Sequence, residues 1–174
     1  RERPGTILCM GALGSACADA LRALHSPVTG WSRTEKSGQL HGEHGLRMGL
    51  SNAQILITLL PKTPDTENLL NAERLALLPR GAVILNPGRG PLIDDDALLA
   101  ALDAGHIGHA TLDVFRVEPL PQGHPFWTHP RVTVTPHIAA DTRAITASRV
   151  IAENIRRGEA GEPLRHLVDR ARGY

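Results

Sequence analysis

The chain has 174 residues, and its 19 Lys+Arg nearly balance its 18 Asp+Glu, which leaves a formal net charge of +1. A hydrophobic content of 41% with 21% charged residues is typical of a globular protein and excludes a disordered chain. The charge balance argues against binding to nucleic acid or to an anionic membrane surface. Aromatic residues at 3% leave few side chains for base stacking. Two cysteines cannot build a disulfide framework, so we expect a reducing compartment, the cytoplasm.

The first residue is Arg1 and not Met, so we expect a fragment or a processed product. The apolar stretch 7–13 after Arg3 resembles the core of a secretory signal. We favour a buried strand instead, because glycines interrupt the stretch and an amphipathic helix pattern follows it. No window approaches the length of a membrane span.

Apolar runs alternate with helical patterns along the chain. Strands are predicted at 6–10, 27–31, 54–60, 82–85, 110–114 and 132–134. Helices are predicted at 15–24, 71–78, 94–104 and 144–157. Residues 34–51 are expected to form loops with one short helix, and 120–130 a loop. Six short strands separated mainly by helices predict a doubly wound parallel sheet of the Rossmann type, with ligands at the carboxyl ends of the strands.

The turn after the first strand contains Gly11, Ala12, Leu13 and Gly14. Gly11 would let the backbone approach a pyrophosphate, Gly14 would let strand and helix pack closely, and the helix N-terminus would face the phosphates. Cys9 replaces the first glycine of the usual motif, and it would fit with a negative φ, for which the geometry of the turn is left open. A plain strand-to-helix turn is the alternative.

The second strand ends in Trp31, Ser32 and Arg33, and Arg33 stands 19 residues after Gly14. An NAD site places an acid near this position to bind the ribose 2′-hydroxyl. Ser32 and Arg33 can instead hydrogen-bond to a 2′-phosphate. We therefore predict NADP(H) in preference to NAD(H), with a solvated surface arginine as the alternative.

Three further segments follow apolar runs, at 86–90, 112–120 and 135–140. They should meet at one edge of the sheet, where they supply a cation, a carboxylate and an imidazole. Those groups suit the reduction of a 2-keto acid with a nicotinamide. The cation would bind the substrate carboxylate and polarise the keto oxygen, and the imidazole would protonate that oxygen. The carboxylate orients the imidazole and favours its protonated form.

These segments resemble the coenzyme-binding domain of the D-isomer-specific 2-hydroxyacid dehydrogenases, and within them the bacterial glyoxylate/hydroxypyruvate reductases of the A type. The resemblance covers nearly the whole chain: the glycine turn, 31–33, 59–61 with 63–64, 86–90, 112–120, 124–127, 133–140 and the tail 168–174. The spacings of 29 residues from Arg89 to Glu118 and of 19 from Glu118 to His137 fit the family's order.

The resemblance implies that Arg89 binds substrate, that His137 donates a proton and that Glu118 is its partner. It also implies cofactor contacts beyond the turn and the second strand, namely Leu60, Pro61, Thr66, Pro87, Asp113, His137 and Ala139. The implied substrate is a small 2-keto or 2-hydroxy acid, and the implied assembly is a homodimer.

Family members have a second, largely N-terminal substrate domain, which we expect to be absent from this chain. We expect a dinucleotide-binding domain at 1–158 and, at 159–174, a tail that in the family packs on the absent domain. Three hypotheses stay open: a reductase of glyoxylate and hydroxypyruvate, a non-catalytic NADP-binding module, and a dimerisation unit.

Two histidine pairs, His41 with His44 and His106 with His109, suggest a metal site. Zinc needs three or four converging ligands, and we expect neither pair to be completed by enough of them. We therefore expect no metal, and we expect Cys9 and Cys17 to be small packing residues.

Overall fold

The computed structural model describes residues 3–140 and 142–170 of the chain. These fall into two compact units, Arg1–His137 and Ile138–Tyr174, each of which is described by itself.

The first unit is built on a seven-stranded sheet in the order β3-β2-β1-β4-β5-β6-β7, and every pair of neighbours is parallel. The strands are β1 Gly5–Leu8, β2 Val28–Ser32, β3 Leu40–His41, β4 Ile55–Thr58, β5 Ala82–Asn86, β6 Ile107–Leu112 and β7 Val132–Val134. The chain starts in the middle of the sheet and winds outward in both directions. The predicted doubly wound Rossmann-type fold is confirmed, with its switch point between β1 and β4.

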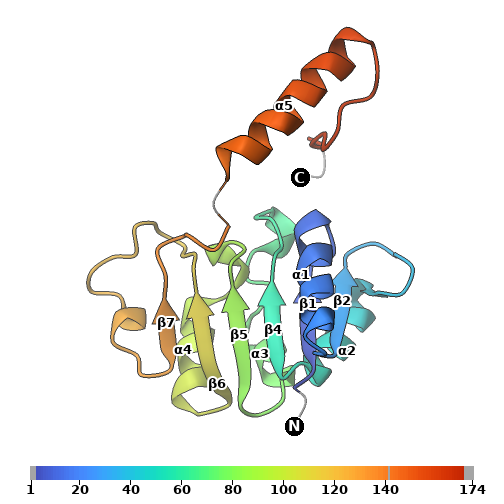
Figure 1. Ribbon diagram of the computed structural model, residues 1–174. Coiled ribbons are helices and arrows are strands. Elements are labelled where there is room, and N and C mark those ends of the chain that lie inside the picture. The colour runs from blue at the N-terminus through green and yellow to red at the C-terminus, as the bar shows by residue number, and fades with distance from the viewer. Residues whose placement is uncertain (1–2, 141, 171–174) are drawn as a thin grey trace. The chain divides into compact units, whose positions relative to one another are not determined.

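Helices cover both faces of this sheet (Figure 1). They are α1 Ala12–Ala23, α2 Gly42–Asn52, α3 Ala72–Leu77 and α4 Asp95–Asp103, with short 3₁₀ turns η1 Pro64–Thr66, η2 Gly90–Leu92 and η3 Pro125–Trp127. Right-handed crossovers place α1 on one face and α2, α3 and α4 on the other, because the winding direction reverses after β3. The side chains of Asn71 and Asp94 cap α3 and α4 by accepting hydrogen bonds from backbone N–H groups.

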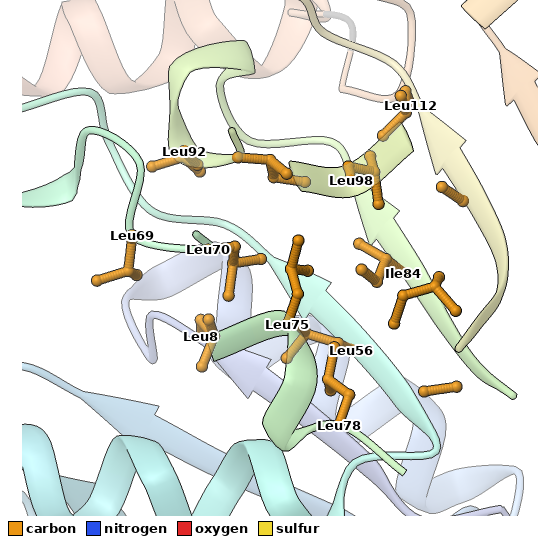
Figure 2. Packing of buried hydrophobic residues seen from close by; sticks show 14 of the residues in the cluster. Leu8, Leu56, Leu69, Leu70, Leu75, Leu78, Ile84, Leu92, Leu98 and Leu112 are labelled. Atoms are coloured by element: carbon orange, nitrogen blue, oxygen red, sulfur yellow. The ribbon is translucent and has the colours of Figure 1, made fainter. Parts of the chain in front are cut away.

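The hydrophobic core is divided in the same way, with one cluster against α2, α3 and α4 and another against α1. A large leucine-rich cluster lies between the sheet and the helices α2, α3 and α4, and Leu56, Leu75, Ile84 and Leu98 are among its members (Figure 2). A small cluster of Ile7, Met10 and Ala18 lies under α1. Burial of the large cluster anchors the strands, so the loops at their carboxyl ends start from fixed positions.

The largest departure from the predicted elements lies at residues 34–51, expected to be mainly loop. They contain β3 and most of the eleven-residue helix α2. Two of the glycines that suggested a loop are packing positions: a Cβ on Gly45 would lie 3.2 Å from Leu40, and one on Gly49 would lie 3.2 Å from Thr6. Glycine here permits close contact between the helix and the strands.

Two other elements begin three residues earlier than predicted. Strand β6 begins at Ile107 and ends at Leu112, whereas 110–114 was predicted. Pairing with β5 extends it toward its N-terminus. Helix α1 begins at Ala12, three residues before the predicted start, because the helix grows directly out of the glycine turn.

The second unit contains α5, Ala144–Glu159, a helix whose large apolar residues Ile145, Ile151 and Ile155 are exposed. The compact division falls after His137, whereas the sequence suggested a boundary after 158. Among the described residues, no helix has the length and apolar character needed to cross a membrane.

Candidate active site

The turn between β1 and α1 has the shape of a dinucleotide-binding turn, and Cys9 adopts it with φ +90°. Cys9 fits without the negative φ that the sequence made a condition, because it takes the left-handed conformation that favours glycine. The reason lies in the tight return of the chain. A Cβ on Gly14 would lie 1.9 Å from the Cys9 carbonyl oxygen, so helix and strand touch backbone to backbone. The close packing predicted for Gly14 is confirmed.

The first turn of α1 offers unpaired N–H groups to solvent. Gly11 caps the helix without a side-chain hydrogen bond, and the first turn holds no acid. Gly11, Ala12 and Leu13 are exposed, and a Cβ on Gly11 would meet only the Cys9 Sγ, at 3.9 Å. Open space in front of free N–H groups fits a bound pyrophosphate.

A cation that the sequence reasoning missed lies at the same turn. Lys36 follows β2, and its Nζ donates to the Met10 carbonyl oxygen at 3.1 Å. This contact places a positive charge next to the free N–H groups of α1. The gap of 26 residues between Lys36 and Met10 left no local sequence signal.

The residues predicted at the end of β2 have different surroundings. Trp31 is buried, and its indole N–H donates to the Gly42 carbonyl at 2.9 Å. The Ser32 hydroxyl is also buried, near the Thr34 carbonyl at 3.0 Å and the Gln39 Oε1 at 3.1 Å. Arg33 is exposed, and its Nη1 lies 3.1 Å from Asp65 Oδ2. Arg33 is therefore the member of this group that extends into solvent.

The loop after β4 lies beside Arg33 through that ion pair. Leu60 is buried and Pro61 half-buried. The Thr66 hydroxyl donates to the Pro61 carbonyl at 2.7 Å and accepts from the Thr63 N–H at 2.8 Å. Thr66 therefore closes the loop that carries Asp65, and the Thr66 hydroxyl makes its hydrogen bonds within that loop.

Asn86, at the end of β5, shapes the loop that carries Arg89. Its Oδ1 accepts from the Thr58 hydroxyl at 2.6 Å and from the Gly88 N–H at 3.1 Å. Its Nδ2 donates to the Arg89 carbonyl at 3.1 Å. Pro87, a predicted cofactor contact, is half-buried within this loop. The buried amide of Asn86 fixes the backbone from which the exposed Arg89 projects.

The loops after β5 and β6 touch directly. A Cβ on Gly90 would lie 2.0 Å from the Phe115 carbonyl carbon, so only glycine allows this contact. Asp113 is buried beside it: its N–H donates to the Asn86 carbonyl at 3.1 Å, and its Oδ1 accepts from the Thr135 hydroxyl at 2.5 Å. Asp113 thus connects the ends of β5, β6 and β7.

Glu118 and His137 form a hydrogen-bonded pair at this edge. His137 Nδ1 lies 2.8 Å from Glu118 Oε2, and the Phe115 N–H donates to Glu118 Oε1 at 2.9 Å. The Glu118 side chain is 36% exposed and the His137 side chain is 50% exposed, so the pair faces solvent. His137 has φ +56°, in the left-handed region that favours glycine. The Nε2 atom forms no hydrogen bond within the part of the chain that the structure describes.

Electrostatics favour an ionised Glu118. Partial burial by itself raises the pKa of Glu118, but the His137 hydrogen bond, the Phe115 N–H and the charges of His137 and Arg89 lower it. The pKa therefore lies below its ordinary value of 4.5.

Of the predicted residues, Ala139 lies in the second unit and is exposed there. Across residues 3–140 and 142–170, no group of three or more His, Cys, Asp or Glu side chains could hold a metal ion. His106 contacts the Leu75 carbonyl and His109 the Thr133 hydroxyl, so each has a local partner.

Known proteins share this architecture. Residues 2–139 match the family model described as D-isomer specific 2-hydroxyacid dehydrogenase, NAD binding domain. A D-isomer specific 2-hydroxyacid dehydrogenase from Xanthobacter autotrophicus Py2, solved with NADPH and MES, is 49% identical with a TM-score of 0.95. The match covers 99% of this chain and 73% of that one.

Two further solved structures are similar over 99% of this chain and 57% of their own length. One is an NADPH-dependent glyoxylate/hydroxypyruvate reductase from Sinorhizobium meliloti with NADP and sulfate, 38% identical with a TM-score of 0.92. The other is a probable 2-hydroxyacid dehydrogenase from Rhizobium etli CFN 42 with NADP, 35% identical with a TM-score of 0.91. The chain thus spans little more than half of these two proteins.

The sheet order and the turn define an NAD(P)-binding domain of the Rossmann type. The family match and the identities go further: the chain belongs to the D-isomer-specific 2-hydroxyacid dehydrogenases, of which it is the coenzyme-binding part.

Proposed function

We propose that the protein of which this chain is the coenzyme-binding part reduces small 2-keto acids to D-2-hydroxy acids with NADPH, with glyoxylate and hydroxypyruvate as its substrates. The observation that carries this proposal is the contact of 2.8 Å between His137 and Glu118, at the edge of the sheet that also holds Arg89. An ionised carboxylate on Nδ1 and a free Nε2 are what a histidine proton donor needs.

The proposed roles follow from the chemistry of each group. The nicotinamide of a bound cofactor supplies a hydride to the keto carbon. His137 donates its Nε2 proton to the keto oxygen as the C–H bond forms, which leaves a neutral imidazole and a hydroxyl group. Glu118 stabilises the protonated ring before transfer and fixes its orientation through Nδ1. Arg89 binds the substrate carboxylate and polarises the keto oxygen.

Cofactor preference is proposed to depend on Arg33. Arg33 extends into solvent at the end of β2. NAD sites place an acid near this position, and here the preceding residue is Ser32. Lys36 adds a second cation at the glycine turn. The complexes of the Xanthobacter protein with NADPH and of the Sinorhizobium protein with NADP support the same preference.

Dissociation constants for NADPH and NADH, measured by titration on the same preparation, test this preference. We expect tighter NADPH binding, and we expect Arg33→Asp to reverse the order. Arg22→Asp is the matched control: Arg22 is exposed and pairs with Asp19 on α1, so both affinities should stay unchanged. Equal affinities, or tighter NADH binding by the unmodified protein, would contradict the preference for NADPH.

Steady-state oxidation of NADPH with glyoxylate or hydroxypyruvate tests the activity. Turnover that His137→Gln abolishes supports the reductase. NADPH binding with background turnover supports the alternative, a non-catalytic NADP-binding or dimerisation module. The homodimer and the cytoplasmic location stay predictions, for which sedimentation and cell fractionation are the tests.

A further inference from the structure

The ion pair between Arg33 and Asp65 places an acid beside the residue that we assign to the 2′-phosphate. We propose that Asp65 is a specificity-determining residue that limits the preference for NADPH over NADH. This inference rests on the proposed function, because it assumes that Arg33 binds the 2′-phosphate.

The position of Asp65 is fixed by its own loop. It lies within η1, which Thr63 and Thr66 close with reciprocal hydrogen bonds. The Thr66 side chain is buried and anchors that turn to the Pro61 carbonyl at 2.7 Å. The Asp65 carboxylate is therefore presented by a rigid turn next to the end of β2, although it stands 32 residues from Arg33 in sequence.

Asp65 acts on a phosphate in two ways. Its Oδ2 lies 3.1 Å from Arg33 Nη1, so it occupies one of the guanidinium donors that a forked contact with phosphate would use. It also cancels the positive charge of Arg33 and repels a dianionic phosphate bound there. NADH carries a hydroxyl in place of that phosphate, so Asp65 neither competes with a phosphate for Arg33 nor repels one.

The opposite effect of Asp65, holding Arg33 in place, is the smaller one. The two side chains are 39% and 73% exposed, and exposed ion pairs contribute little to ordering. A charge about 4 Å away in water changes a binding constant by about fivefold. Repulsion of the phosphate therefore outweighs loss of the ion pair, and removing the charge should tighten NADPH binding.

The experiment compares Asp65→Asn with Glu67→Gln by titrating each with NADPH and with NADH. Asparagine keeps an oxygen that accepts a hydrogen bond from Arg33 and removes only the charge. Glu67 is the matched control, because it changes the net charge equally two residues away but faces Arg116, at 3.6 Å. Arg33→Ala is measured alongside to test the assumption about Arg33.

We expect Asp65→Asn to tighten NADPH binding by about 3- to 10-fold, to leave NADH binding unchanged and to lose this advantage at high salt. Glu67→Gln should change neither affinity. Unchanged or weaker NADPH binding by Asp65→Asn, while Arg33→Ala weakens it, overturns the role of Asp65 alone. Unchanged NADPH binding by Arg33→Ala overturns the proposed function of Arg33 itself.

Discussion

The two halves of the strand-end edge are organised by different means. At the ends of β1, β2 and β4, the backbone sets the shape: Cys9 has a positive φ, and Gly14 touches the Cys9 carbonyl. The charged side chains there, Arg33 and Asp65, are exposed. At the ends of β5, β6 and β7, buried side chains add to such backbone contacts, because Asn86 and Asp113 are hydrogen-bonded to neighbouring segments.

This difference matches the tasks proposed for the two halves. A pyrophosphate is bound by backbone N–H groups, so the binding half needs a precise main chain and tolerates mobile side chains. Proton transfer needs side-chain atoms at fixed distances, so the chemical half needs a network that holds them. Substitutions should therefore damage the first half mainly through backbone clashes, and the second half through lost side-chain contacts as well as through a clash at Gly90.

The largest effect is expected from Gly14→Ala. The new Cβ would lie 1.9 Å from the Cys9 carbonyl oxygen, so α1 must move away from β1. We expect a loss of about 3 kcal/mol or more in the free energy of unfolding, measured in urea, and loss of NADPH binding. Gly11→Ala is the control, because its Cβ meets only the Cys9 Sγ at 3.9 Å. Equal stability of the two variants would show that the turn is not built by close contact.

Glu118→Gln tests the second half. It keeps the size of the side chain and removes the charge that stabilises protonated His137. We expect turnover of NADPH with glyoxylate to fall roughly 100-fold or more, with no change in NADPH affinity. Asp103→Asn is the control, because Asp103 pairs with His129 at 3.2 Å and lies outside the proposed site. A similar fall in both variants would count against a specific role for Glu118.

Cys9→Gly tests the strained backbone conformation in the turn after β1. Glycine adopts φ +90° without the steric cost that a Cβ carries, so we expect the protein to gain about 1 kcal/mol in stability. His25→Gly is the control, because His25 also has a positive φ, 59°, at the far end of α1. Both variants should be stabilised with unchanged NADPH affinity. Destabilisation by Cys9→Gly would mean that the thiol contributes contacts that outweigh the strain.

The smallest effect concerns pH. The pKa of Glu118 is lowered in the folded protein, so its contribution to stability is present above its ordinary pKa and is lost as the pH falls through the lower folded value. The difference in unfolding free energy between the unmodified protein and Glu118→Gln should be below about 1 kcal/mol at neutral pH. It should disappear in acid below pH 4.5. If this difference in unfolding free energy instead grew as the pH fell, the predicted direction of the Glu118 pKa shift would be contradicted.

Sequence patterns predicted the sheet and most of its helices because apolar periodicity reports burial directly. They missed the extent of α2, because its glycines suggested a loop, whereas Gly49 packs against Thr6, far away in sequence. They also missed Lys36 and Asp65 as parts of the site, because each is placed by a contact with a distant segment. The φ of Cys9 was unpredictable from residue type, since the packing at Gly14 overrides the intrinsic preference of cysteine.

Single-turnover mixing of the NADPH-bound protein with glyoxylate tests the central claim most directly. The proposal predicts that nicotinamide absorbance decays in one phase, and that His137→Gln slows this decay at least about 100-fold at unchanged NADPH affinity. His129→Gln alters another histidine that pairs with a carboxylate, and this variant should decay at the unmodified rate. Equal decay rates for His137→Gln and the unmodified protein would contradict the assignment of His137 as the proton donor.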